Sequence, residues 1–274
     1  MYNRLVGKLF YQFVKPLLVY KGNKEDVKAL TELVQLVASA PAGRKILEGI
    51  MARRKPVTLF FVSELKNNEG LPISGQYYWV DNSVKLLRKN QDLSKMNREE
   101  AIRSKIETTC VLAHELQHSA DGSINKWLDL HAANIDESVL VNVLAEAHAV
   151  LSEDQLDREL RAQYGLLGKR ITQGKEEKET TEPVPTARLK KATERALSGE
   201  ISMFRGYMNR RRRLVSRRKY PERGLRATAV FRETVEDYLK EMNVSMSFTE
   251  AIMHVKQSIK LLPAAKIQSE KRDR

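Results

Sequence analysis

The stretch that most constrains this chain is residues 111–121, V-L-A-H-E-L-Q-H-S-A-D, which contains the pattern H-E-x-x-H. Two histidines four residues apart, His114 and His118, project from one face of a helix and can coordinate one metal ion. Glu115 lies one position along, so it cannot bind the ion in the same geometry. It can instead take a proton from a water held by the ion. The other residues between 111 and 120 are uncharged, as a buried metal helix requires. The stretch therefore predicts a helix with a zinc site.

A catalytic zinc site needs a third protein ligand, while its fourth position is left to water. Glu146 and His148 lie in the segment 140–151, which is apolar nearly all round, and a carboxylate there is costly unless it is paired or bound to metal. The two side chains point roughly 160° apart around a helix axis, so we do not expect both to bind the ion. The residues considered for this position are Asp121, His131, Asp136, Glu137, Glu146 and His148.

H-E-L-Q-H at 114–118, followed 28 residues later by E-A-H-A, resembles the gluzincin arrangement of zinc peptidases. The order is also similar to small bacterial metallopeptidases of the effector type, in which a helix like S-A-P-A-G-R-K-I-L (39–47) precedes short strands. The resemblance covers roughly residues 25–165, and H-E-x-x-H is its specific motif. It implies a zinc metallopeptidase with a minimal-zincin domain, in which Glu115 is the general base and His114, His118 and Glu146 hold the zinc. No G-x-x-H follows the motif, which speaks against metzincins, and no G-T-x-D-x-x-Y-G is present, which speaks against aspzincins.

Hydrophobic periodicity predicts an α+β fold that is mostly helical, with a small sheet. A strand is expected at 57–62, and the segments 75–80 and 84–87 are typical of a hairpin whose turn is Asp81-Asn82. Asn97 with Glu100 resembles a capping box that starts the H-E-x-x-H helix, and Asp121-Gly122 is expected to end it. Helices are predicted at 24–39, 43–54, 97–120, 123–133, 137–151, 152–164, 187–204, 225–242 and 248–262.

Composition along the chain predicts three parts: a zincin-like domain at 1–166, a linker at 167–186 and a helical basic region at 187–274. The net charge of +13 is uneven, because residues 1–166 carry 22 Lys+Arg against 21 Asp+Glu, whereas 167–274 carry 26 against 14. Arg210–Arg213 and Arg217–Lys219 form the densest basic run, which favours a polyanion or an acidic protein as partner. The alternative to a peptidase is therefore a protein that binds nucleic acid or a membrane surface and carries an inactive or structural H-E-x-x-H. A zinc hydrolase that acts on a non-peptide bond is a further alternative.

A peptidase of this kind also needs a strand edge that holds the substrate backbone extended and a donor for the developing oxyanion. The strands at 57–62, 75–80 and 84–87 are the candidates for the edge. The donor stays open between Tyr77, Tyr78, His131 and Tyr164, each of which also suits a purely structural role.

The single cysteine, Cys110, excludes an intramolecular disulfide and any zinc site built from three or four thiolates. It lies one turn before His114, but residues 110 and 118 would be about 12 Å apart along a helix, so one ion cannot bridge them. We expect Cys110 to be a small buried residue. The chain has neither a long apolar run nor a compact secretory signal, which favours the cytoplasm, or export by a route that leaves no such signal.

Overall fold

The computed structural model describes residues 2–67, 70, 72–88, 96–166, 171–172, 175–176, 224–242, 244 and 246–253. The chain divides into two compact units. The first comprises Met1–Lys126 and Ala145–Val184, and the second comprises Trp127–Leu144 and Pro185–Arg274.

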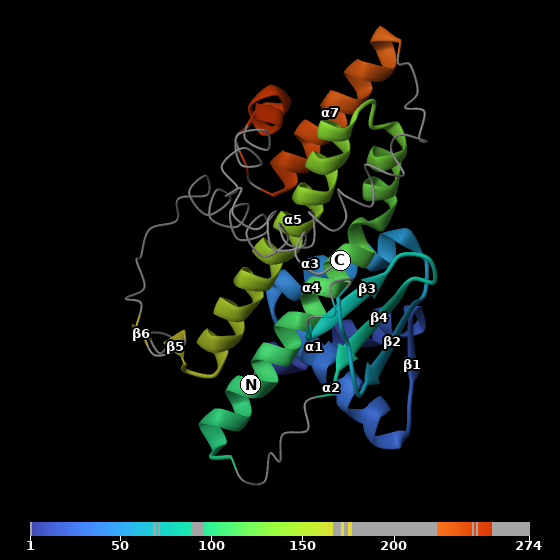
Figure 1. Ribbon diagram of the computed structural model, residues 1–274. Helices are drawn as coiled ribbons and strands as arrows, with labels where there is room; N and C mark the ends of the chain where they lie inside the picture. The colour runs from blue at the N-terminus through green and yellow to red at the C-terminus, as the bar shows by residue number, and fades with distance from the viewer. Residues whose placement is uncertain are drawn as a thin grey trace, which may run out of the picture. The chain divides into compact units, whose positions relative to one another are not determined.

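The first unit contains a four-stranded mixed sheet in the order β1-β2-β4-β3 (Figure 1). Its strands are β1 (Leu18–Lys21), β2 (Val57–Val62), β3 (Gly75–Tyr78) and β4 (Ser83–Leu87). β1 and β4 both run parallel to β2, whereas β3 pairs antiparallel with β4, so the predicted hairpin is confirmed. Asn82 adopts a positive φ of 51° in its turn, a conformation that Asn tolerates better than most residues. β3 therefore forms one edge of the sheet.

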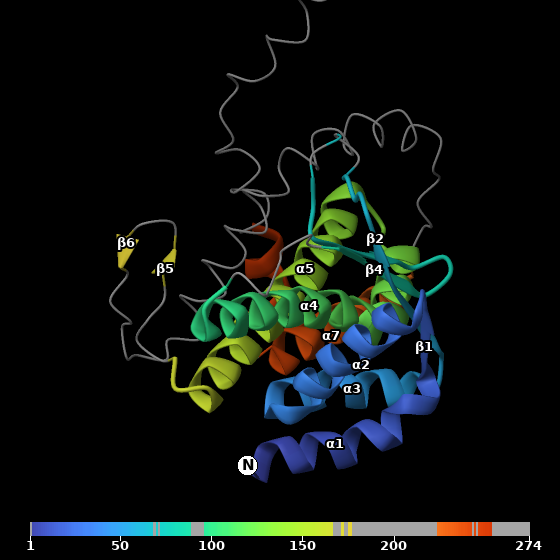
Figure 2. The same cartoon turned by 90° about the horizontal axis from the view of Figure 1, so that it is seen from below.

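Five helices accompany this sheet: α1 (Tyr2–Val14), α2 (Lys24–Ser39), α3 (Pro41–Arg53), α4 (Arg98–His131) and α5 (Ile135–Gln163), with a 3-10 turn η1 at Lys15–Leu17. Asn23 starts α2 because its Oδ1 accepts a hydrogen bond from the Asp26 backbone N–H at 2.8 Å. Seen from below, α2, α3 and α4 lie on one side of the sheet and α1 lies beyond α2 and α3 (Figure 2). Apolar side chains from the helices and the inner sheet face form one core, which includes Leu30, Leu47, Leu59, Leu86, Leu112 and Leu116.

The two long helices differ from the sequence prediction, which divided each of them in two. α4 continues through Asp121-Gly122, because Asp121 Oδ1 accepts a hydrogen bond from Gln117 and Gly122 packs against the Arg53 guanidinium. These contacts offset the cost of about 1 kcal/mol that a glycine imposes on a helix interior. α5 continues through Ser152, whose hydroxyl donates to Gln117 Oε1 at 3.0 Å and does not cap a helix.

In the second unit, α7 (Leu225–Glu241) confirms the helix predicted at 225–242. The loop between α4 and α5 also lies here, and Asn134 accepts a hydrogen bond from the Glu137 N–H at 3.0 Å, which caps α5. Phe231 lies fully buried, with its ring centroid 6.0 Å from that of Phe248. A small aromatic and aliphatic core therefore holds the described part of this unit together.

The mostly helical α+β fold with a small sheet is confirmed. The basic run at 187–219, the helix expected at 187–204 and the end of the helix expected at 248–262 lie outside the described residues. The same holds for most of the predicted linker at 167–186, of which Ile171–Thr172 and Lys175–Glu176 form the short strands β5 and β6. Among the helices that the structure describes, none is long and apolar enough to cross a membrane.

Candidate metal centre

Helices α4 and α5 bring together His114, His118 and Glu146, whose ligand atoms all lie within 4.8 Å of one another. The Nε2 atoms of the two histidines are 3.2 Å apart. Glu146 Oε2 lies 3.3 Å from His114 Nε2, and its Oε1 lies 3.2 Å from His118 Nε2. The structure therefore brings the two histidines of the motif together with Glu146, the third ligand that the resemblance implies, inside the first unit.

The donor atoms of His114, His118 and Glu146 lie close enough together to hold one metal ion. A tetrahedral ion with ligand bonds of about 2.0–2.1 Å has ligands about 3.3 Å from one another. The separations of 3.2 and 3.3 Å to the histidines involve different oxygens of Glu146, and one ligand atom from each of the three residues lies within 4.8 Å of the others. Two imidazole nitrogens and one carboxylate are also the donor set of one type of catalytic zinc site. The group could hold a zinc ion through three protein ligands.

Glu115 follows His114 on α4 and is buried, with 9% of its surface exposed. Burial raises the pKa of its carboxyl group, while the neighbouring His114 and His118 lower it in part. The backbone of Tyr77 on β3 hydrogen-bonds to Glu115 and also favours the charged form. A carboxyl group whose pKa is raised towards neutrality suits a residue that must both accept and donate a proton.

Gly75 shows how closely β3 approaches this carboxylate. A Cβ built on Gly75 would lie 2.6 Å from Val111 Cγ1 and 3.0 Å from Glu115 Cγ. Both distances are shorter than ordinary carbon–carbon contacts. Only a residue without a side chain lets the strand edge pack against α4 at this point.

A second carboxylate, Glu153, approaches the other side of His114. Its Oε2 lies 3.1 Å from His114 Nδ1, the ring nitrogen that does not face Glu146. Burial lowers the pKa of His114, but hydrogen bonds to Glu146 and Glu153 outweigh it, and the net pKa is raised well above its usual value. The contact with Glu153 fixes the orientation of the ring, which leaves Nε2 directed at the cluster.

The cluster is strongly coupled electrostatically. Burial lowers the pKa of His118, yet the charge of Glu146 and the hydrogen bond to it raise it overall. Burial raises the pKa of Glu146, but the two histidines lower it well below its ordinary value. The site therefore favours a negatively charged Glu146 facing positive charge. A divalent cation could supply that positive charge in place of protonated histidines.

His148, the other candidate on α5, lies in a different group. Its Nδ1 is 2.7 Å from Asp121 Oδ2, and both residues are buried. Gln117 Nε2 donates to Asp121 Oδ1 at 2.9 Å. Asp121 and His148 thus pair with each other away from His114 and His118. The remaining candidates for the third ligand, His131, Asp136 and Glu137, belong to the second unit.

Among the four candidates for an oxyanion donor, Tyr77 lies at the cluster. Its ring is stacked on His118 with the centroids 6.4 Å apart, and its hydroxyl donates to Asn82 Oδ1 at 2.9 Å. The Tyr78 hydroxyl donates to Gln76 Oε1, and Tyr164 packs against the core. The hydroxyls of Tyr77 and Tyr78 therefore have protein acceptors, and the identity of the donor stays a prediction.

Sequence reasoning missed Glu153 and Gly75. Glu153 carried a usable signal, because it follows Glu146 by seven residues and therefore lies two turns along the same face of α5. The sequence signal at Gly75 was weaker, because a glycine at the start of an expected strand is also common in turns. Its role depends on the contact between β3 and α4, which no local pattern reports.

Comparison of the chain with protein-family models finds no match. Searches of the curated proteins and of the solved structures find none either. The resemblance to zinc peptidases therefore depends on the H-E-x-x-H motif alone.

Proposed function

We propose that the chain is a zinc-dependent metallopeptidase. The observation that carries the proposal is the convergence of His114, His118 and Glu146 at separations of 3.2–3.3 Å, with Glu115 buried beside them. Zinc held by these three residues would supply a Lewis acid that lowers the pKa of a bound water and polarises the scissile carbonyl.

Glu115 would act as the general base. Its carboxylate, buried beside the cluster, would accept a proton from the attacking water and return that proton to the leaving amine. Its hydrogen bond from the Tyr77 backbone holds the carboxylate in place beside the cluster. His114 is oriented in turn by Glu153, which holds its Nε2 towards the cluster.

Strand β3 supports a peptide as the substrate. It lies at one edge of the described sheet, next to β4, and its residues Gly75 and Tyr77 contact Glu115. An extended peptide can add to such an edge through main-chain hydrogen bonds, which would place its backbone near the cluster. A protein or peptide is therefore the substrate class that we propose.

Zinc content and peptide hydrolysis, measured together, test this proposal. We expect one zinc per wild-type chain by elemental analysis, loss of zinc in Glu146→Ala, and retention in His148→Ala. Glu115→Gln should keep the zinc and lose hydrolysis of a quenched fluorescent peptide library by a factor of about 100 or more. Absence of zinc from the wild type after reconstitution would refute the proposal, as would full activity in Glu115→Gln.

The uneven charge favours a second candidate, a polyanion-binding protein whose H-E-x-x-H is inactive or structural. Residues 187–219 carry 12 Lys+Arg and only two acidic residues, Glu194 and Glu200. Binding to nucleic acid or to an anionic surface should then survive Glu115→Gln and weaken when Arg210–Arg213 are neutralised. A zinc hydrolase acting on a non-peptide bond would keep the zinc but leave every peptide intact.

A further inference from the structure

Helix α1 is firmly seated on the first unit along one of its faces. Tyr11 and Val14 are buried, with 3% and 0% of their surfaces exposed. A Cβ built on Gly7 would lie 2.7 Å from the Cα of Ser39, so the helix approaches α2 as closely as a glycine permits. The orientation of α1 is therefore fixed by packing, and so is the direction of its outer face.

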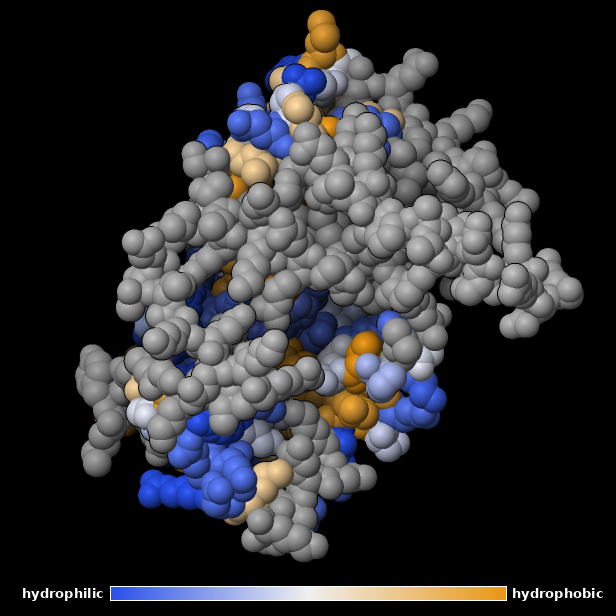
Figure 3. Space-filling model, turned by 60° about the vertical axis from the view of Figure 1, so that its left-hand side comes forward, coloured by the Kyte–Doolittle hydropathy of each residue, from blue (hydrophilic) through white to orange (hydrophobic). Residues whose placement is uncertain are grey.

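The outer face of α1 carries three large apolar side chains. Leu5, Leu9 and Phe13 are 59%, 59% and 73% exposed, and they follow one another at intervals of four residues. Side chains at this spacing form a continuous row along a helix. On the face drawn in Figure 3, hydrophobic atoms reach the surface in separate groups between hydrophilic side chains. Single exposed apolar residues are ordinary, but a contiguous row of them indicates a binding surface.

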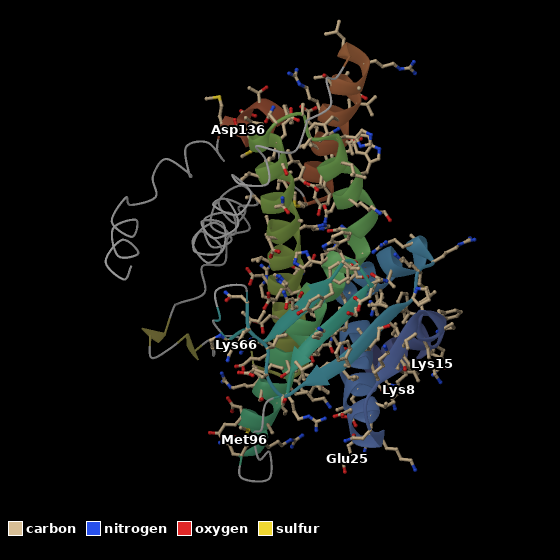
Figure 4. The ribbon with its side chains drawn as sticks, turned by 45° about the vertical axis from the view of Figure 1, so that its right-hand side comes forward. Lys8, Lys15, Glu25, Lys66, Met96 and Asp136 are labelled. Atoms are coloured by element: carbon tan, nitrogen blue, oxygen red, sulfur yellow. The ribbon has the colours of Figure 1, made fainter. Side chains whose placement is uncertain are left out.

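The segment that carries this row, residues 1–24, is basic. Residues 1–24 contain five basic residues and no acidic one, the basic residues being Arg4, Lys8, Lys15, Lys21 and Lys24. Lys8 and Lys15, labelled in Figure 4 on the segment α1–η1, are exposed beside the apolar row. A partner that covers the row must therefore tolerate several positive charges, and a negatively charged partner is favoured.

We propose that the outer face of α1 docks this protein on an anionic lipid surface. Leu5, Leu9 and Phe13 would enter the boundary between headgroups and acyl chains, while the flanking lysines contact lipid phosphates. Binding of a surface helix strengthens with its buried apolar area and with its attraction to anionic lipids, and each basic residue near an anionic leaflet strengthens binding roughly fivefold. A second copy of the chain is disfavoured as the occupant, because it would bring the same positive charge against this face.

The docking surface is independent of the proposed peptidase activity. It uses no residue of the cluster on α4 and α5, so either proposal can fail while the other stands. If both hold, α1 restricts hydrolysis to substrates at the membrane surface.

Vesicle binding by the full chain tests the proposal. Because the basic run at 210–213 could bind vesicles by itself, every protein carries Arg210→Gln, Arg211→Gln, Arg212→Gln and Arg213→Gln. Co-sedimentation compares vesicles of phosphatidylglycerol and phosphatidylcholine with vesicles of phosphatidylcholine alone. The test variant combines Leu5→Gln, Leu9→Gln and Phe13→Gln. The matched control is Val80→Gln, which removes an apolar side chain that is 75% exposed elsewhere in the same unit.

We expect binding to the anionic vesicles that the triple variant weakens about tenfold or more and the control leaves unchanged. In a Cys110→Ser background, an environment-sensitive dye at Leu9→Cys should shift to the blue on binding, whereas the same dye at Val80→Cys should not. Equal binding by the triple variant, no shift at position 9, or no binding at all would overturn the proposal. Self-association of the protein that only the triple variant abolishes would also overturn it and would assign the row to a second copy.

Discussion

The Nδ1 atom of His114 lies 3.1 Å from Oε2 of Glu153, a carboxylate two helical turns beyond Glu146 on α5. The two glutamates thus hold opposite sides of one imidazole ring, since Glu146 lies 3.3 Å from its Nε2. A carboxylate on the outer nitrogen of a metal-binding histidine fixes the tautomer and makes the ring a better ligand.

Glu153→Gln should weaken zinc binding without abolishing it. The amide cannot supply the negative charge that supports His114, and loss of such a partner typically costs 10–100-fold in metal affinity. Competition with a chromogenic chelator measures the effect. Asp154→Asn, which changes the adjacent carboxylate on α5, is the matched control and should bind zinc like the wild type. Equal affinities for Glu153→Gln and the wild type would contradict a positioning role.

Gly75→Ala should destabilise the first unit and disturb Glu115. The new methyl group would lie 2.6 Å from Val111 Cγ1 and 3.1 Å from Glu115 Oε1, so β3 or α4 must shift. Overpacking of this kind costs about 1–3 kcal/mol, which urea denaturation can measure. Gly224→Ala is the comparison for steric space, because nothing lies within 4 Å of a Cβ there; as the N-cap of α7 it should lose only about 0.5–1 kcal/mol. An unchanged urea midpoint for Gly75→Ala would show that the strand has room to adjust.

The sequence predicted much of this architecture because its signals were local. The helix at Lys24–Ser39 matches its prediction at both ends, since Asn23 caps it and Pro41 starts the next helix. The hairpin was predictable from Asp81-Asn82 and the flanking apolar residues. Helical geometry alone predicted that Glu146 and His148 point in different directions. In the structure Glu146 contacts His118, whereas His148 contacts Asp121.

What the sequence missed depends on contacts between distant segments. Asp121-Gly122 and Ser152 are typical helix boundaries, but Gln117, His148 and Arg53 supply partners that keep both helices continuous. The separation of 28 positions along the chain likewise gave no direct measure of the distance between His118 and Glu146. That distance is set by the α4–α5 hairpin, whose geometry no local pattern contains.

The buried pair Asp121 and His148 should contribute to stability and leave zinc binding intact. Removal of one partner leaves a buried polar group with a lost hydrogen bond, at a cost of about 1–3 kcal/mol. His148→Ala and Asp121→Ala should each lower the free energy of unfolding, and the double variant should lose less than the sum of the two. Chemical denaturation of the four proteins measures this coupling. Strict additivity would show that the 2.7 Å contact contributes little.

Cys110 should be unreactive in the folded protein. The thiol is 4% exposed, and burial raises its pKa well above the usual range, as do the negative charges of Asp157 and Glu153. Because the thiolate is the reactive form, a raised pKa lowers reactivity at pH 8. We expect native protein to react with an aromatic disulfide reagent on the order of 100-fold more slowly than protein in guanidinium chloride. The denatured sample and a Cys110→Ser variant are the controls, and equal native and denatured rates would show that α4 opens readily around the cysteine.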